Sequence, residues 1–102
     1  MKRVVFELQL GGGSASADTR ARRWHIVKRV RDDDAAQLLA ERSYTYRWDD
    51  GWFAFITVRA ALPRERVKSD GFSGYGWMVD NILRYGSPYK TGLAEGMAGG
   101  KS

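Results

Sequence analysis

The stretch from residue 43 to residue 60, SYTYRWDDGWFAFITVRA, constrains the fold more than any other part of the chain. Two runs rich in aromatic and β-branched residues flank Asp49, Asp50 and Gly51, a pattern typical of a β-hairpin. Gly51, at the third loop position, can take the positive φ that a type I turn followed by a bulge requires. The stretch also holds six of the chain's 13 aromatic residues (4 Trp, 5 Tyr and 4 Phe). A hairpin here therefore places much of the chain's apolar surface in one sheet.

The loop length decides which side chains share a face of this hairpin. A three-residue loop pairs Trp48 with Trp52, Tyr46 with Ala54 and Tyr44 with Ile56. That face continues at Val58 and is apolar enough for the core, while the reverse face carries Thr45, Arg47, Phe53, Phe55, Thr57 and Arg59. A two-residue loop would instead pair Trp48 with Phe53 and Tyr46 with Phe55. We favour the three-residue loop because it gives the cleaner alternation.

Length and composition indicate one small domain, which we place at residues 1–90. The chain has 102 residues, of which 43% are hydrophobic and 28% charged, as in globular rather than disordered proteins. No apolar run approaches the roughly 18 residues of a membrane span, and the opening MKRVVFELQL is too short and acid-containing for a signal sequence. The absence of Cys fits a reducing compartment. We expect a cytoplasmic protein with no membrane association.

The positive charge is concentrated near the start of the chain. Residues 1–31 contain eight Lys or Arg against Glu7 and Asp18, a net +6, while the remainder is close to neutral and the whole chain is +5. Such asymmetry suggests a polyanionic partner more than general solubility.

The first elements are a strand and a loop. Residues 4–10 are rich in strand formers and predict a β-strand that ends at Gly11. Residues 11–19, GGGSASADT, are small and polar and predict a flexible loop. They lack the Lys-Ser or Lys-Thr pair of a phosphate-binding P-loop.

Residues 20–31, RARRWHIVKRVR, form the basic segment. As a strand, it places Trp24, Ile26, Lys28 and Val30 on one face and Arg23, His25, Val27, Arg29 and Arg31 on the other. As a helix, cations surround it on most sides, so the strand is the better interpretation. The following Asp32, Asp33 and Asp34 are typical of a helix N-terminus and its caps, with a helix expected over 35–42 that buries Ala35, Leu38 and Leu39.

A second amphipathic helix is predicted over residues 72–85. Apolar residues recur there at helical spacing: Tyr75, Met78, Val79, Ile82 and Leu83. Gly86 fits the C-cap, and the Gly-rich residues 91–102 are expected to form a disordered tail. The order strand, strand, helix, hairpin, helix predicts an α+β fold with two helices packed on a mainly antiparallel sheet of about four strands. The reverse face of the hairpin is open only if both helices cover the apolar face.

The candidate binding residues come from the basic segment and the hairpin. The cations expected to hold phosphate are Arg20, Arg22, Arg23, Lys28, Arg29 and Arg31. The residues expected to stack on bases or to form an interface are Trp24, Arg47, Phe53, Phe55, Arg59 and Trp77. Cations and flat side chains are what single-stranded nucleic acids or nucleotide ligands require. The competing interpretations are a solvated charged face for the cations, a core position for Trp24, and a covered or dimeric interface for the two phenylalanines.

The sequence offers little evidence of catalysis. His25 is the only histidine, and a ribonuclease-like toxin would need Glu41, Tyr44 or an arginine beside it, which the spacing does not support. Ser73 in GFSGYG departs from the GxSxG nucleophile elbow, and the aspartates are better explained by helix and turn positions than by Mg²⁺. We expect no enzyme activity, no cofactor and no metal.

The sequence thus predicts a small non-enzymatic protein whose basic N-terminal third binds nucleic acid or a nucleotide ligand. The alternative is an inhibitor or adaptor of the phage or mobile-element type, which acts on an acidic protein surface through exposed aromatic residues such as Trp77. A homodimer is compatible with either hypothesis.

Overall fold

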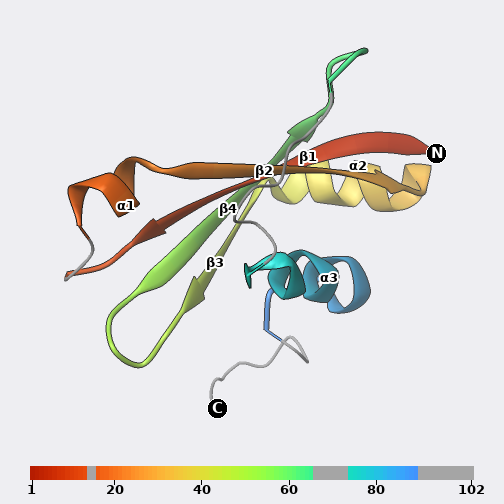
Figure 1. Cartoon of the computed structure of the whole chain (residues 1–102). Coiled ribbons are helices and arrows are strands. Elements are labelled where there is room, and N and C mark those ends of the chain that lie inside the picture. Colours follow the sequence, from red (N-terminus) through yellow and green to blue (C-terminus); the bar gives the residue numbers. More distant parts are fainter. Residues whose placement is uncertain (14–15, 66–73, 90–102) are drawn as a thin grey trace. The chain divides into compact units, whose positions relative to one another are not determined.

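The described part of the chain forms an antiparallel sheet with three helices in the order β1, α1, β2, α2, β3, β4, α3 (Figure 1). The computed structural model describes residues 1–13, 16–65 and 74–89. The elements are β1 (Lys2–Gly11), α1 (Ala17–Ala21), β2 (Arg23–Val30), α2 (Asp32–Glu41), β3 (Ser43–Arg47), β4 (Phe53–Ala60) and α3 (Gly76–Tyr85). The strands lie in the order β2-β1-β4-β3, and every neighbouring pair is antiparallel. The predicted α+β fold with a four-stranded antiparallel sheet is confirmed.

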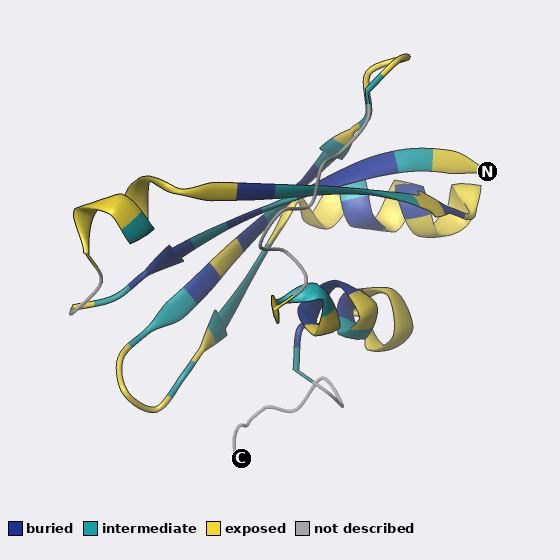
Figure 2. Cartoon of the chain, viewed as in Figure 1, coloured by how far each residue is buried: buried dark blue, intermediate teal, exposed yellow. Residues whose placement is uncertain are grey.

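Strand alternation divides the sheet into two faces. Val4, Phe6, Leu8 and Leu10 of β1 are buried, and they pair across β4 with Ala60, Val58, Ile56 and Ala54. Trp24 and Val30 of β2 are buried on the same side. These residues form the apolar face, whose burial supplies the main hydrophobic stabilisation of the sheet (Figure 2). Because β1 lies between β2 and β4, its successive side chains point alternately to the centre of one face of the sheet and to the centre of the other.

The hairpin of β3 and β4 has the register predicted from its sequence. Tyr44 pairs with Ile56 and Tyr46 with Ala54, and the Trp48 amide donates to the Trp52 carbonyl oxygen at 2.9 Å. Gly51 takes a φ of 93°, a backbone conformation that residues other than glycine rarely adopt. The three-residue loop is therefore confirmed.

The basic segment forms a strand, as predicted, but the loop before it is shorter than expected. β2 begins at Arg23, whereas residues 17–21 form the single helical turn α1. Ser16 caps this turn, because its hydroxyl oxygen accepts a hydrogen bond from the Thr19 amide at 3.1 Å. The prediction of a loop to residue 19 missed this local hydrogen bond.

α2 begins at Asp32, earlier than the helix predicted over 35–42, ends at Glu41, and contacts β1 and β4. It buries Ala35 and Leu38 as predicted, whereas Leu39 is only half-buried. The three aspartates occupy its first turn, where carboxylates favour the positive end of the helix dipole, but no side chain caps the helix. The predicted side-chain cap is wrong, because Arg31 occupies the N-cap position.

The chain divides into two compact units, Met1–Phe72 and Ser73–Ser102. In the second, α3 carries the buried Met78, Val79 and Ile82 and ends at Gly86 in the left-handed conformation, as predicted. Leu83 is exposed rather than buried. The predicted start at residue 72 and the predicted tail at 91–102 lie outside the described residues, and a single domain over 1–90 stays a prediction.

Candidate functional site

The face of the sheet opposite the core is rich in polar and charged side chains, and we call it the polar face. Cross-strand pairing assigns its members. They are Arg3, Val5, Glu7, Gln9 and Gly11 of β1, Arg23, His25, Val27 and Arg29 of β2, Ser43, Thr45 and Arg47 of β3, and Phe53, Phe55, Thr57 and Arg59 of β4. Val5 is buried here, while the arginines of β2 and β3 are exposed.

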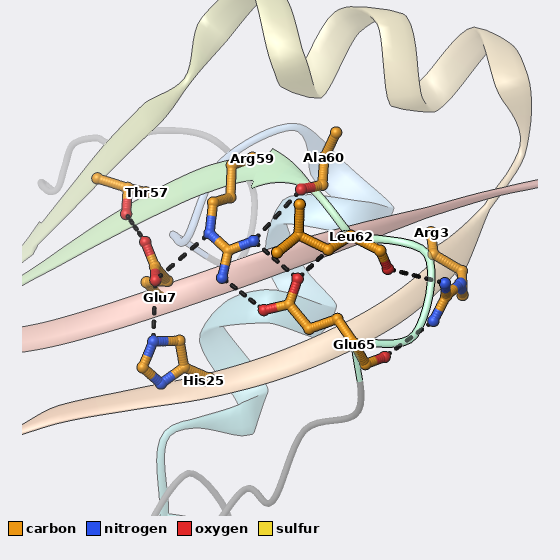
Figure 3. A network of polar contacts seen from close by, with 8 residues as sticks. All are labelled: Arg3, Glu7, His25, Thr57, Arg59, Ala60, Leu62 and Glu65. Atoms are coloured by element: carbon orange, nitrogen blue, oxygen red, sulfur yellow. Dashed lines mark hydrogen bonds and ion pairs between the residues drawn. The ribbon is translucent and has the colours of Figure 1, made fainter.

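A network of ion pairs lies at the middle of the polar face, centred on Glu7 (Figure 3). Glu7 has His25 and Thr57 as its cross-strand neighbours. Its Oε2 lies 2.8 Å from His25 Nε2 and 3.5 Å from Arg59 Nε. Its Oε1 accepts only a long hydrogen bond, 3.5 Å, from the Thr57 hydroxyl. One carboxylate oxygen is thus held by two nitrogen donors while the other keeps accepting capacity.

Glu65 joins the connection after β4 to this network. Its carboxylate accepts two hydrogen bonds from Arg59, at 2.8 and 2.5 Å, and a third from the Leu62 amide at 3.0 Å. The Arg59 hydrogen bonds chiefly, and the Leu62 amide next, lower the pKa of Glu65 to about 2, and the same pairing raises the pKa of Arg59. Arg3 reinforces the connection by donating to three carbonyl oxygens, of Leu62, Pro63 and Glu65.

The two phenylalanines of β4 differ in accessibility. Phe53 lies over Gly11, where an added Cβ would stand 2.5 Å from its ring, and the Arg47 guanidinium lies 5.8 Å from the ring centroid. Phe55 is 41% exposed. Phe55 is therefore the accessible flat surface of the polar face, and Phe53 is held by its neighbours.

A pocket of about 120 Å³ opens beside Phe55. Its lining comes from three adjacent strands: Glu7, Leu8, Gln9, Arg23, Phe55 and Thr57. The Gln9 amide nitrogen donates to the Arg20 carbonyl oxygen at 2.7 Å, so α1 fixes the orientation of this side chain. Arg23 makes a hydrogen bond to the Ala21 carbonyl oxygen at 3.2 Å and is otherwise exposed to solvent.

The predicted binding residues are only partly brought together. Arg23, Arg29, Arg47, Arg59, Phe53 and Phe55 all lie on the polar face. Lys28 and Trp24 lie on the opposite side of β2, and Trp24 is buried, which favours its core interpretation. Arg20 and Arg22 lie in and after α1, Arg31 precedes α2, and Trp77 lies in α3, where it is 41% exposed.

His25 meets partners that the sequence did not indicate. It pairs with Glu7, whereas Tyr44 lies on the apolar side of the hairpin, and Glu41 lies in α2. Burial, together with the Glu41 carboxylate, raises the pKa of Tyr44, so that its phenol keeps its proton near neutral pH. Glu7, Gln9, Thr57 and Glu65 were all missed as site residues. The positions of Glu7, Gln9 and Thr57 beside the predicted candidates follow from the pairing of β1 with both β2 and β4, which no local pattern indicated.

Within residues 1–13, 16–65 and 74–89, no cluster of three or more His, Asp or Glu is arranged to hold a metal ion. Over the same residues, no helix has both the length and the apolar character needed to cross a membrane. Comparison of the chain with protein-family models, with curated proteins and with solved structures finds no match.

Proposed function

We propose that the chain binds nucleic acid through the polar face of its sheet. The observation that carries this proposal is the meeting of two parts of the sequence on one surface. Arg23 and Arg29 of the basic segment lie on the same face as the exposed Phe55 of the hairpin, with β1 between them. Phosphates need cations and bases need flat side chains, and this face offers both.

The charge of the polar face favours a polyanionic partner. Its strands present five arginines, namely Arg3, Arg23, Arg29, Arg47 and Arg59, against Glu7, and the connection after β4 adds Glu65. Arg3 and Arg29 are direct cross-strand neighbours, although like charges in such a pair destabilise a sheet. A bound phosphate would relieve that repulsion.

The arginines of this face do not contribute equally. Arg59 is engaged by Glu65 and Glu7, and Arg3 is engaged by three backbone carbonyls. Arg23 and Arg29 are exposed at the ends of β2 and are the phosphate contacts in this proposal. Arg20, Arg22 and Arg31 add positive charge at the two ends of the same strand.

The test compares neighbouring cations on opposite faces of one strand. Arg29→Gln and Lys28→Gln remove the same charge from adjacent residues, but only Arg29 lies on the polar face. Binding to a labelled single-stranded oligonucleotide is measured by fluorescence anisotropy between about 50 and 200 mM salt, the range over which phosphate contacts weaken steeply.

Arg29→Gln and Arg23→Gln are each expected to weaken binding and to reduce the slope of log K against log salt by about 0.7, the value for one contact to a single strand. Lys28→Gln is expected to change the affinity and the salt slope much less. Equal losses of affinity in Lys28→Gln and Arg29→Gln would show that only the net charge of the chain matters, and would contradict binding by this face. No binding at the lowest salt would overturn the proposal.

A protein partner is the second candidate, and the exposure of Trp77 on α3 is the observation that favours it. Trp77 is 41% exposed and Tyr85 42%, and exposed Trp and Tyr are frequent anchors of protein interfaces. If this candidate is correct, a complex recovered with the tagged chain survives nuclease treatment and is lost in Trp77→Ala but not in Arg29→Gln. Loss of the complex on nuclease treatment would contradict it.

A further inference from the structure

We infer that the pocket beside Phe55 takes one unpaired base of a single-stranded nucleic acid and prefers bases that carry an exocyclic amino group. This inference rests on the proposed function and names the form of nucleic acid that the polar face binds. It depends on three observations: the size of the pocket, the exposed ring at its edge, and the polar atoms that line it.

The pocket is too small to enclose a whole ligand. Its volume is about 120 Å³, whereas sites that bury entire small molecules measure roughly 300–1,000 Å³. It therefore suits one planar group of a larger molecule whose remainder lies across the sheet. A free nucleotide would leave its sugar and phosphate outside, so a polymer with further phosphate contacts is the better occupant.

Phe55 and Arg23 are placed to hold the base and the backbone of the same strand. Both residues are cross-strand neighbours of Gln9, on β4 and β2 respectively. Two inter-strand spacings separate their Cα atoms by roughly 10 Å, which the long arginine side chain can bridge over the pocket. A base stacked on Phe55 then has its phosphate within reach of the Arg23 guanidinium.

A duplex cannot use this pocket, because its bases are paired and stacked on one another inside the helix. Single strands offer free base faces, and stacking on an aromatic side chain is the usual way in which proteins bind them. The inference therefore predicts a preference for single strands over duplexes, beyond the phosphate contacts that the two share.

Two of the side chains that line the pocket, Gln9 and Glu7, offer acceptors to a base, while the donors of Arg23 are directed to the phosphate in this inference. Gln9 donates one amide N–H to the Arg20 carbonyl oxygen, and its Oε1 remains an acceptor. Glu7 Oε1 accepts a long hydrogen bond, 3.5 Å, from the Thr57 hydroxyl. Adenine and cytosine carry amino donors, N6 and N4, where thymine and uracil carry the O4 carbonyl, and guanine carries its amino donor at N2, where thymine and uracil carry O2. An acceptor that faces another acceptor is left without a hydrogen bond, which disfavours thymine and uracil.

The experiment uses labelled oligonucleotides of about ten nucleotides and the full-length protein chain at about 50 mM salt. The series comprises an all-thymidine strand, three strands with one central adenine, cytosine or guanine, their uridine-based RNA equivalents, and a duplex of the same length. Binding is measured by fluorescence anisotropy for the wild-type chain and for the variants Phe55→Ala and Gln9→Ala. Leu62→Ala is the matched control, because Leu62 is an exposed apolar residue that does not line the pocket.

We expect the central amino-bearing base to tighten binding about 5- to 10-fold over all-thymidine, the effect of roughly one additional hydrogen bond. Phe55→Ala is expected to weaken single-strand binding about 5- to 100-fold, the range for loss of one stacked base, and to leave duplex binding unchanged. Gln9→Ala is expected to reduce the base preference while retaining the preference for single strands. Leu62→Ala should match the wild type, and similar results for DNA and RNA would show that the 2′-hydroxyl is not read.

The outcomes separate this inference from the proposed function. Salt-dependent binding that is equal for duplex and single strand, and unaffected by Phe55→Ala, would overturn the base pocket and leave nucleic-acid binding in place. Equal affinity for all bases would overturn the amino preference. No binding of any oligonucleotide would overturn both the proposed function and this inference. Thermal unfolding of each variant checks that it is folded, and the exposure of Phe55 makes its truncation mild.

Discussion

Glu65 fixes the connection after β4 to the polar face of the sheet. Its carboxylate accepts from both terminal nitrogens of Arg59 and from the Leu62 amide, so a single side chain ties a turn to a strand. Arg3 holds the same connection through backbone carbonyls. The pair occupies Arg59, and this is why Arg23 and Arg29, rather than Arg59, are the phosphate contacts in our proposal.

The lowered pKa of Glu65 predicts a specific loss of stability in acid. The folded chain lowers this pKa from 4.5 to about 2, so the ionised form is favoured by folding. The stabilisation is complete above pH 4.5 and is lost as the pH falls toward 2. Urea unfolding measured from pH 6 down to pH 2 should show a smaller decline for Glu65→Gln than for the wild type.

The ionisable groups around Glu65 are Arg59, Arg3, Glu7 and His25, and only a comparison with the variant isolates its contribution. Arg64→Gln, which changes the charge of the adjacent exposed residue, serves as the control. Parallel pH profiles for Glu65→Gln and the wild type would contradict the role of the Arg59 pair.

At the level of the elements, Gly11 of β1 pairs with Phe53 of β4. The Phe53 ring covers Gly11, and an added Cβ there would meet ring atoms at 2.5 Å. The ring fills the space that a side chain would otherwise occupy, while Arg47 lies near it from β3. This contact explains why Phe53 is less accessible than Phe55 although both lie on the same face.

Gly11→Ala is expected to displace the Phe53 ring and to destabilise the chain by about 1–3 kcal/mol, the usual cost of overpacking. Gly13→Ala is the matched control, because nothing lies within 4 Å of its added Cβ. The free energy of unfolding in urea measures both. An unchanged midpoint for Gly11→Ala would show that the ring moves aside at no cost.

Local patterns in the sequence predicted most of the elements. The alternation of the basic segment indicated a strand with Arg23, His25 and Arg29 on one side, and the position of Gly51 indicated the hairpin register; both are confirmed. α1 was missed because its cap is a local contact, in which the Ser16 hydroxyl oxygen accepts a hydrogen bond from the Thr19 amide. The Asp32 to Asp34 run was placed correctly at a helix start, but its predicted capping role was wrong.

The network around Glu7 could not be predicted from the sequence. Glu7, His25 and Arg59 are far apart in the chain, and they meet only because β1 pairs with both β2 and β4, while Glu65 joins them through its nearby partner Arg59. Binary patterning gives the face of each residue on its own strand but not the order of the strands. The pocket beside Phe55 has the same origin, since its lining comes from three strands.

On the scale of the molecule, the strand order brings the basic N-terminal third next to the aromatic hairpin. β1 is the shared neighbour of both, and its Phe6 is fully buried between Ile26 and Val58. The cations and the exposed ring are therefore parts of one sheet rather than of a tail and a domain. Loss of the core at β1 should remove both together.

Phe6→Ala is expected to lower the free energy of unfolding by about 3–5 kcal/mol, because it leaves a cavity in the central strand. This is a large share of the roughly 5–15 kcal/mol of a typical domain. Thr45→Ala, in the outer strand β3, should cost far less. Thermal unfolding, monitored by circular dichroism, measures the stability of the two variants. A small effect of Phe6→Ala would contradict the central position of this side chain.

The central position of β1 also has a consequence for how the chain folds. β1 is synthesised before both of its neighbours, and one of them, β4, begins more than 40 residues later, at Phe53. Pairing with β2 closes a short loop, whereas pairing with β4 requires a long one and gives the sheet a high contact order. During synthesis, the central strand of the sheet therefore keeps one edge unpaired until the hairpin arrives. We expect the β1–β4 pairing to be the step that limits the folding rate.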